Sequence, residues 1–264
     1  MQAVDFVEVG SGKKVVLIHS SVSGARQWRR LMGDLECQFH TIAVNLLGYG
    51  QTPAWSAEQR QSLDDQAALI EAVLPDDRSQ VCLLGHSFGG CVAMKAAARL
   101  GDRVDKLILI EPNPFYLLNL HGCAEAYAEI IDLRDWVKRH GARGDWLQAA
   151  ERFADYWSGS GTWSSMPDER KAAFIHALKP NFHEWYAVID ERTTLDEWAH
   201  LLPRQTLVSS AEDTVRPIHE IVGLMQRDCP AWQFVQIPEG GHMAPLARPD
   251  LVNPIIVSFL SGPC

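Results

Sequence analysis

The sequence predicts an α/β fold: a mostly parallel central sheet, helices on both faces of the sheet, and an inserted helical segment. Two observations support this prediction. Short, fully apolar runs alternate with helix-like segments up to about residue 110, and the same alternation returns near residue 205. Strands that are apolar on both faces are typical of parallel sheets covered on both sides. We expect a sheet-and-helix core over residues 1–114 and 200–264, with a helical cap, or lid, over residues 115–199.

Each expected element follows from its pattern of apolar residues. The strands are short apolar runs, often β-branched, at 14–18, 41–44, 80–84, 106–110, 205–209 and 232–237. The helices carry apolar residues three or four positions apart, at 25–35, 63–74, 89–100 and 218–227. The last helix allows two interpretations. Either Asn253 caps a helix whose first residue is Pro254, or a helix begins at Pro249 and kinks at Pro254.

The segment between the two halves of the core has a different composition. Residues 115–199 lack clear strand runs and contain six of the nine tryptophans, at positions 136, 146, 157, 163, 185 and 198. Ordinary helix packing accounts for most of these rings. One or two of them are expected to line an apolar substrate pocket beneath the cap.

Composition excludes several classes of partner. The chain has 24 Lys and Arg residues against 33 Asp and Glu, a formal net charge of −9, so nucleic acid is not an expected partner. No segment resembles a signal peptide or a membrane span. The six cysteines form no CxxC pair, which favours free thiols in a cytoplasmic protein, at positions 37, 82, 91, 123, 229 and 264. We expect a monomer or homodimer that needs no metal and no cofactor.

The strongest motif is Gly85-His86-Ser87-Phe88-Gly89, which fits the pattern G-x-S-x-G. A buried strand precedes it and a helix of small residues follows it. In this context the motif is a sharp strand-to-helix turn that exposes the serine hydroxyl, and glycines let strand and helix approach each other. A structural turn that contains a serine by chance is the alternative. The strand–turn–helix context favours Ser87 as a nucleophile.

A serine nucleophile needs a base, and an acid that orients the base. His242 lies in a glycine-rich loop directly after the last expected strand, late in the chain, where this type of site requires a histidine. Two adjacent carboxylates, Glu212 and Asp213, follow the strand at 205–209. Glu111 is a further candidate because it ends the strand at 106–110, although a turn residue before a proline is the simpler interpretation.

Together these motifs resemble the α/β-hydrolase fold superfamily, and specifically its capped esterase- and lactonase-like members. The segment His19-Ser20-Ser21 is similar to the family's oxyanion loop, with Ser20 in place of the usual glycine. The spacing of Ser210, Asp213 and Pro217 is similar to the turn that carries the acid, and the resemblance selects Asp213. The segment around Gly241 and His242 is similar to the one that carries the catalytic histidine.

The resemblance implies a catalytic triad of Ser87, His242 and Asp213, with the backbone N–H groups of Phe88 and Ser21 as the oxyanion hole. It implies hydrolysis of a carboxylic ester or lactone of a small, largely apolar molecule through an acyl-enzyme. One alternative on the same scaffold is a carbon–carbon bond hydrolase of diketone-like ring-cleavage products. Another is a slow-turnover ligand receptor, since one fold can serve several functions.

Overall fold

A seven-stranded sheet forms the centre of the molecule. The computed structural model describes residues 3–56, 58–77 and 79–262. In these ranges the strand order is β1-β3-β2-β4-β5-β6-β7. The strands are β1 (Phe6–Val9), β2 (Lys13–Ile18), β3 (Phe39–Val44), β4 (Val81–His86), β5 (Val104–Ile110), β6 (Thr206–Ala211) and β7 (Gln233–Ile237). All neighbouring pairs are parallel except β1 and β3. The predicted fold class is confirmed.

Strand β1 is the element that the sequence patterns miss. It lies at one edge of the sheet and pairs only with β3, antiparallel, with Phe6 opposite Val44. Phe6 and Val7 are 40% and 51% exposed. An edge strand of four residues has no fully buried apolar run, so the criterion that finds the inner strands does not apply to it.

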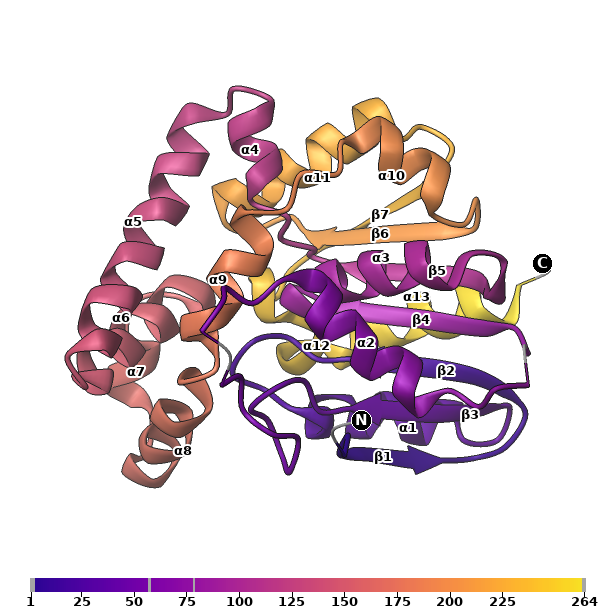
Figure 1. Cartoon of the computed structure of the whole chain (residues 1–264), viewed down its shortest axis with the longest axis horizontal. Helices are drawn as coiled ribbons and strands as arrows, with labels where there is room; N and C mark the ends of the chain where they lie inside the picture. Colours follow the sequence, from indigo (N-terminus) through magenta and orange to yellow (C-terminus); the bar gives the residue numbers. More distant parts are fainter. Residues whose placement is uncertain (1–2, 57, 78, 263–264) are drawn as a thin grey trace.

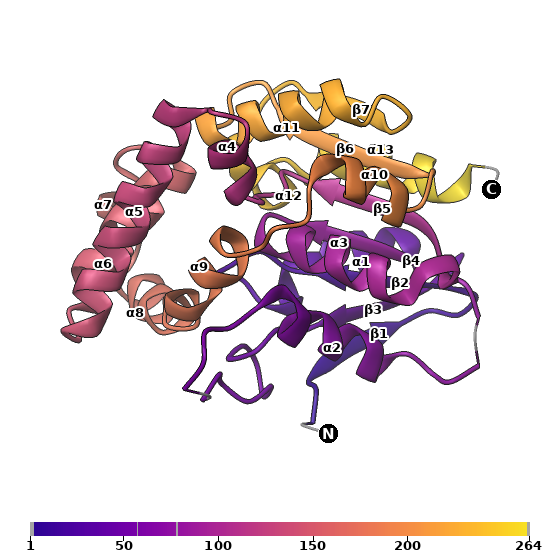
Figure 2. The same cartoon turned by 45° about the horizontal axis from the view of Figure 1, so that its top comes forward.

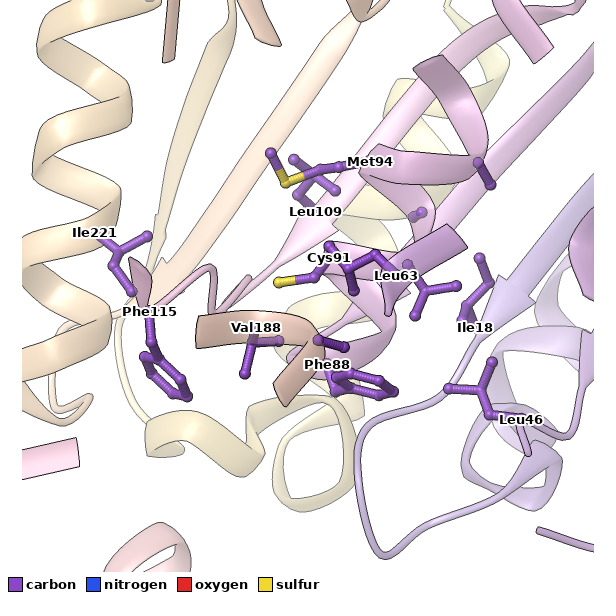
Figure 3. Close-up of a cluster of buried hydrophobic side chains, with 14 of the residues drawn as sticks. Ile18, Leu46, Leu63, Phe88, Cys91, Met94, Leu109, Phe115, Val188 and Ile221 are labelled. Atoms are coloured by element: carbon purple, nitrogen blue, oxygen red, sulfur yellow. The ribbon is translucent and has the colours of Figure 1, made fainter. Parts of the chain in front are cut away.

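Helices cover both faces of the sheet. One face packs against α2 (Leu63–Val73), α3 (Phe88–Leu100), α10 (Leu195–Leu201) and α11 (Arg216–Asp228). The other face packs against α1 (Arg29–Leu35) and α13 (Pro249–Ser261). Figure 3 shows part of the first cluster, where Met94 of α3 and Leu109 of β5 are drawn together. Helix α13 begins at Pro249 and continues through Pro254, so the interpretation in which the last helix begins at Pro249 is the correct one.

Six helices lie between β5 and α10, and we call them the inserted helices. They are α4 (Tyr116–Leu120), α5 (Ala124–Ala142), α6 (Trp146–Ser158), α7 (Thr162–Ser165), α8 (Asp168–Leu178) and α9 (Asn181–Ile189). Figures 1 and 2 show α5 to α8 grouped beyond one end of the sheet. Helix α10 contacts α3 and α11 and so lies beside the sheet. Short 3-10 turns are η1 (Ala25–Trp28), η2 (Gly101–Arg103) and η3 (Gly241–Met243), and a short helix, α12 (Ala244–Ala247), follows η3.

Two further expectations from the sequence are that the cysteines are free thiols and that the chain has no membrane span. Cys37, Cys91, Cys123 and Cys229 are free thiols. Cys82 is buried in β4, and Cys264 lies outside the described residues. Within the described ranges, none of the helices combines the length and the apolar character needed to cross a membrane.

A buried lysine fastens the last helix to the sheet. Lys106 of β5 is 1% exposed. Its ammonium group donates hydrogen bonds to the carbonyl oxygens of Phe259, Leu260 and Gly262, at 3.0, 3.2 and 2.6 Å. Carbonyls at a helix C-terminus lack partners within the helix and carry partial negative charge, so a cation stabilises them.

We therefore expect Lys106→Met to lower the free energy of unfolding by about 2–4 kcal/mol, because it leaves buried carbonyls unpaired. Chemical denaturation followed by circular dichroism measures this change. The control Lys179→Met removes an exposed lysine, and its effect should stay within about 0.5 kcal/mol. Equal effects of the two variants would contradict the proposed role of Lys106.

Candidate active site

The turn between β4 and α3 holds Ser87 in a strained backbone conformation. Its φ and ψ angles are 55° and −121°, a region that non-glycine residues rarely occupy. A side chain on Gly85 would collide with the backbone of Gly89, and one on Gly89 would collide with the carbonyl groups of Ile18 and His19. The two glycines of the motif are therefore needed for the close approach of strand, turn and helix.

Three side chains from different parts of the sequence form a hydrogen-bonded chain. The hydroxyl of Ser87 lies 2.8 Å from Nε2 of His242. Nδ1 of the same imidazole lies 2.9 Å from Oε2 of Glu111. Ser87, His242 and Glu111 are 5%, 3% and 0% exposed. With Nδ1–H donating to the carboxylate, Nε2 is free to accept the serine proton.

Glu111, like Ser87, lies in a strained backbone conformation. It follows β5 directly and adopts a positive φ of 50°. Oε1 accepts a hydrogen bond from the N–H of Ala211 at 2.6 Å, and Oε2 accepts one from the hydroxyl of Thr214. Strained residues of this kind cluster at functional sites, where the surrounding structure fixes them. These donors satisfy a buried carboxylate that also faces His242.

This geometry corrects the expectation that Asp213 holds the imidazole. The carboxylate of Asp213 instead accepts hydrogen bonds from the backbone N–H groups of Gly240 and Gly241, at 3.3 and 2.8 Å. Asp213 therefore binds the backbone of the loop that carries His242 and has no hydrogen bond to the ring among the described residues. Its neighbour Glu212 is exposed. The acid at Nδ1 comes from the end of β5, which is adjacent to β4 in the sheet.

A second set of hydrogen bonds joins the backbone of His242 to the loop after β2. His86 bonds through Nε2 to the carbonyl oxygen of His242 at 2.8 Å, and through Nδ1 to the side-chain amide of Gln27 at 3.0 Å. Gln27 in turn accepts hydrogen bonds from the N–H and the hydroxyl of Ser20, both at 3.0 Å. Burial lowers the pKa of His86 well below its usual value, so this imidazole is neutral.

His19 has a structural role at the start of the loop that follows β2 and contains Ser20 and Ser21. Its Nδ1 lies 2.7 Å from the carbonyl oxygen of Ser20, and its Nε2 accepts a hydrogen bond from the N–H of Leu46 at 3.1 Å. Burial lowers the pKa of His19 to about 4, which keeps the ring neutral at physiological pH. A neutral ring can donate at one nitrogen and accept at the other.

The two expected oxyanion donors border the same cavity as Ser87 and His242. The N–H of Phe88 begins helix α3, and that of Ser21 lies in the turn after β2. Neither N–H has an acceptor in the described part of the chain. By contrast, the neighbouring N–H groups of Ser20 and Val22 are both hydrogen-bonded, to Gln27 and to the hydroxyl of Tyr49.

The cavity over Ser87 is narrow and mostly apolar. The space in which the centre of a water molecule can lie is about 60 Å³. Its walls come from the ends of β2, β4 and β5, from the His242 loop and from the inserted helices. Its aromatic lining residues are Phe88, Phe115, Phe153, Trp157, Phe174 and Trp185. None of the lining residues, which all belong to the described ranges, is a lysine or an arginine.

Inserted helix α6 covers the imidazole of His242. The indole ring of Trp157 lies over His242, with ring centroids 4.2 Å apart and an angle of 36° between the planes. The ring of Phe115 stacks between Trp157 and Trp185, with centroid distances of 6.4 and 5.9 Å. Two of the five tryptophans of the inserted helices thus line the cavity, and Trp157 also covers the imidazole of His242.

Several residues of the site are missed by sequence patterns. Asn113 donates from Nδ2 to the hydroxyl of Ser87 at 3.3 Å, and its Oδ1 accepts a hydrogen bond from the thiol of Cys91. Glu184 of α9 lines the cavity as a buried carboxylate. The position of Asn113 two residues after Glu111, just past a strand end, was an available signal. Glu184 lies within a helical pattern that gives no such signal.

The described residues contain no group of three His, Cys, Asp or Glu side chains arranged to hold a metal ion.

Comparison with known proteins identifies the family of the chain. A model of the alpha/beta hydrolase family matches residues 15–255. The chain belongs to the alpha/beta hydrolase family. A pimeloyl-[acyl-carrier protein] methyl ester esterase of Pectobacterium carotovorum is 33% identical over 93% of this chain and 93% of its own. A 2-hydroxy-6-oxo-6-(2'-aminophenyl)hexa-2,4-dienoic acid hydrolase of Metapseudomonas resinovorans is 24% identical over 97% of this chain and 87% of its own.

A solved structure shows the same fold at lower sequence identity. An esterase of Exiguobacterium antarcticum superposes with a TM-score of 0.78 at 20% identity, over 98% of this chain and 96% of that chain. The predicted membership of the α/β-hydrolase superfamily is confirmed, as is the predicted class of enzyme, an α/β hydrolase.

Proposed function

We propose that this family member is a serine hydrolase of small, uncharged carboxylic esters or lactones, with Ser87 as nucleophile, His242 as base and Glu111 as acid. One observation carries the proposal. A continuous hydrogen-bonded chain joins Ser87, His242 and Glu111 at the wall of a narrow apolar cavity. The names of two similar proteins agree with this chemistry. One is the methyl ester esterase of Pectobacterium carotovorum, similar in sequence, and the other is the esterase of Exiguobacterium antarcticum, similar in fold.

Acylation uses the atoms that this chain brings together. The hydroxyl oxygen of Ser87 attacks the ester carbonyl carbon while its proton passes to Nε2 of His242. The carbonyl oxygen becomes an anion, for which the N–H groups of Phe88 and Ser21 are the donors. Glu111 stabilises the imidazolium and keeps its Nδ1–H in place. The bond to the alcohol then breaks, and His242 gives its proton to the departing oxygen.

Deacylation repeats the sequence with water. His242 takes a proton from a water molecule, whose oxygen attacks the acyl carbon bonded to Ser87. The tetrahedral intermediate collapses, the bond to Ser87 breaks, and the serine oxygen regains a proton from His242. The carboxylic acid leaves, and the enzyme returns to its starting state without a metal or cofactor in any step.

The inserted helices act in this proposal as a cap that limits the substrate. Trp157 and Trp185 come from α6 and α9, and they give the cavity apolar walls. The small volume favours a short acyl group. The buried carboxylate of Glu184 and the lack of a lysine or arginine among the described lining residues disfavour a substrate with its own carboxylate, because an unpaired buried charge is costly.

This charge distribution favours the ester hydrolase over the carbon–carbon hydrolase alternative. The relative from Metapseudomonas resinovorans is named for a dienoic acid, a substrate that bears a carboxyl group. Among the described residues, the lining of the cavity offers no lysine or arginine to pair with such a group. The receptor alternative predicts binding with little turnover, whereas a complete proton-transfer chain supports turnover. Location in the cytoplasm remains a prediction of the sequence.

A panel of p-nitrophenyl esters tests this proposal. We expect kcat/KM for the neutral butyrate ester to exceed that for the hemisuccinate, which is of similar length but ends in a carboxylate, by at least about tenfold. The dodecanoate should also be a poor substrate, because its acyl chain is much larger than that of the butyrate and the cavity over Ser87 is small. Release of p-nitrophenol at 405 nm over many turnovers gives the rates. A preference for the hemisuccinate, or one turnover only, would contradict the proposal.

A further inference from the structure

A buried carboxylate of the inserted helices contacts the loop that carries Ser21. Glu184 of α9 is 1% exposed. Its Oε2 accepts hydrogen bonds from the hydroxyl of Ser21 at 2.5 Å and from Nδ2 of Asn181 at 3.0 Å. Its Oε1 accepts a hydrogen bond from the hydroxyl of Tyr49 at 2.8 Å. A buried carboxylate is costly unless it is hydrogen-bonded, and here three donors converge on it.

Tyr49 extends this contact to the next residue of the loop. Its hydroxyl accepts a hydrogen bond from the backbone N–H of Val22 at 3.0 Å, while it donates to Glu184. Burial and the nearby Glu184 carboxylate raise the pKa of Tyr49 well above its usual value, so the phenol keeps the proton that it donates. Glu184 and Tyr49 therefore hold two successive loop residues, Ser21 and Val22.

The loop needs this support because its backbone is strained. Val22 has a φ of 64°, in the left-handed region that β-branched residues avoid. Such a conformation costs about 1–3 kcal/mol and persists only where surrounding contacts impose it. The same loop geometry leaves the N–H of Ser21 without an acceptor in the described part of the chain, beside the cavity that Ser87 lines.

Helix α9, which carries Glu184, is anchored to the core. It packs against α3, the helix that follows Ser87. Val188 of α9 belongs to the same buried cluster as Phe88, as Figure 3 shows. The carboxylate therefore reaches Ser21, 163 residues away in the sequence, only when α9 lies in this position over the sheet.

We infer that Glu184 is a positioning residue, which holds the Ser21–Val22 backbone so that the Ser21 N–H can donate to the oxyanion. The position of the inserted helices over the sheet would thereby affect catalysis. The inference rests on the proposed function, because it assigns a task within that reaction. Glu184 touches neither Ser87 nor His242 by any hydrogen bond of the described residues. It acts through the loop.

Variants of the two anchoring side chains test this inference. Losing an oxyanion donor lowers turnover about 10²–10³-fold. Since the N–H remains but is less well placed, Glu184→Ala should lower kcat about 10- to 100-fold, with KM changed less than about threefold. Glu184→Gln keeps an acceptor oxygen and should lose less. Tyr49→Phe should resemble Glu184→Ala, and the double variant should be little worse, because both act on one loop.

A boronic acid inhibitor separates oxyanion stabilisation from simple substrate binding. Ser87 adds to boron and its proton passes to His242, which leaves a tetrahedral boronate with an oxygen at the oxyanion position. Its affinity should fall in the same proportion as kcat/KM in the Glu184 and Tyr49 variants. The control is Asp190→Asn. Asp190 lies at the C-terminal end of α9 and forms an ion pair with Arg60. Its replacement should leave kcat and the boronate affinity unchanged.

Each outcome bears on a definite claim. If the wild type hydrolyses none of the neutral esters, the proposed function fails whatever the variants do. If the wild type is active but Glu184→Ala keeps kcat and boronate affinity, or loses only substrate affinity through KM, the inference is overturned. Should Glu184→Ala fail to fold by circular dichroism, Glu184→Gln and Tyr49→Phe, which are close in size to the native residues, decide the question by the same measurements.

Discussion

Replacing Ser87 by alanine should lower kcat for the neutral butyrate ester about 10⁶-fold. The variant has no atom that can form the acyl-enzyme, and His242 loses the proton donor that lies 2.8 Å from its Nε2. What remains is the modest acceleration from binding and oxyanion donors, about 10³–10⁴-fold over water. Steady-state release of p-nitrophenol at high enzyme concentration measures the residual rate.

A second serine in the same cavity provides the matched control. Ser158 lines the cavity but has no hydrogen bond to His242 among the described residues. Ser158→Ala should therefore change kcat less than about threefold. If Ser87→Ala kept more than a few per cent of the activity, another residue would have to supply the nucleophile.

Replacing Glu111 by glutamine should lower kcat about 10⁴-fold, the size of loss seen when the acid of a serine triad becomes an amide. The amide group would donate to Nδ1 of His242 where the carboxylate now accepts. The ring would then carry its proton on Nε2 and could not accept one from Ser87. Pre-steady-state kinetics should place the loss in the acylation step, with KM nearly unchanged.

Asp213→Asn is the matched control, since it makes the same chemical change in the acid that the sequence motif favours. The carboxylate of Asp213 binds the N–H groups of Gly240 and Gly241. An asparagine side chain keeps one acceptor oxygen for these donors, so the loss should stay within about tenfold. A larger loss for Asp213→Asn than for Glu111→Gln would make Asp213 the functional acid.

Sequence patterns identify those parts of the molecule that depend on local chemistry. The inner strands are contiguous apolar runs, and the elbow at Ser87 requires glycines at fixed spacing because of its tight backbone. His242 is found by its place after the last strand. Edge strand β1 is not found because it is not buried on both faces and so has no contiguous apolar run. Whether an element is found depends on how much of its environment is determined by adjacent residues in the sequence.

Contacts between distant segments explain what the sequence leaves open. Glu111 follows β5 and Asp213 follows β6, so both lie at the C-terminal ends of neighbouring parallel strands. The choice between them depends on where Thr214 and the His242 loop lie in space. Asp213 has its own task in the motif, because it shapes the glycine turn before His242. Glu184 sits in an ordinary helical pattern, and only the position of α9 over the loop reveals its contact with Ser21.

The most direct test of the triad is labelling by a fluorophosphonate, followed by mass mapping of the modified peptide. We predict one label, on Ser87, that forms rapidly in the wild type and in Asp213→Asn, slowly in Glu111→Gln, and not at all in Ser87→Ala. A label on another serine, or labelling slowed more by Asp213→Asn than by Glu111→Gln, would contradict the assignment of Ser87, His242 and Glu111.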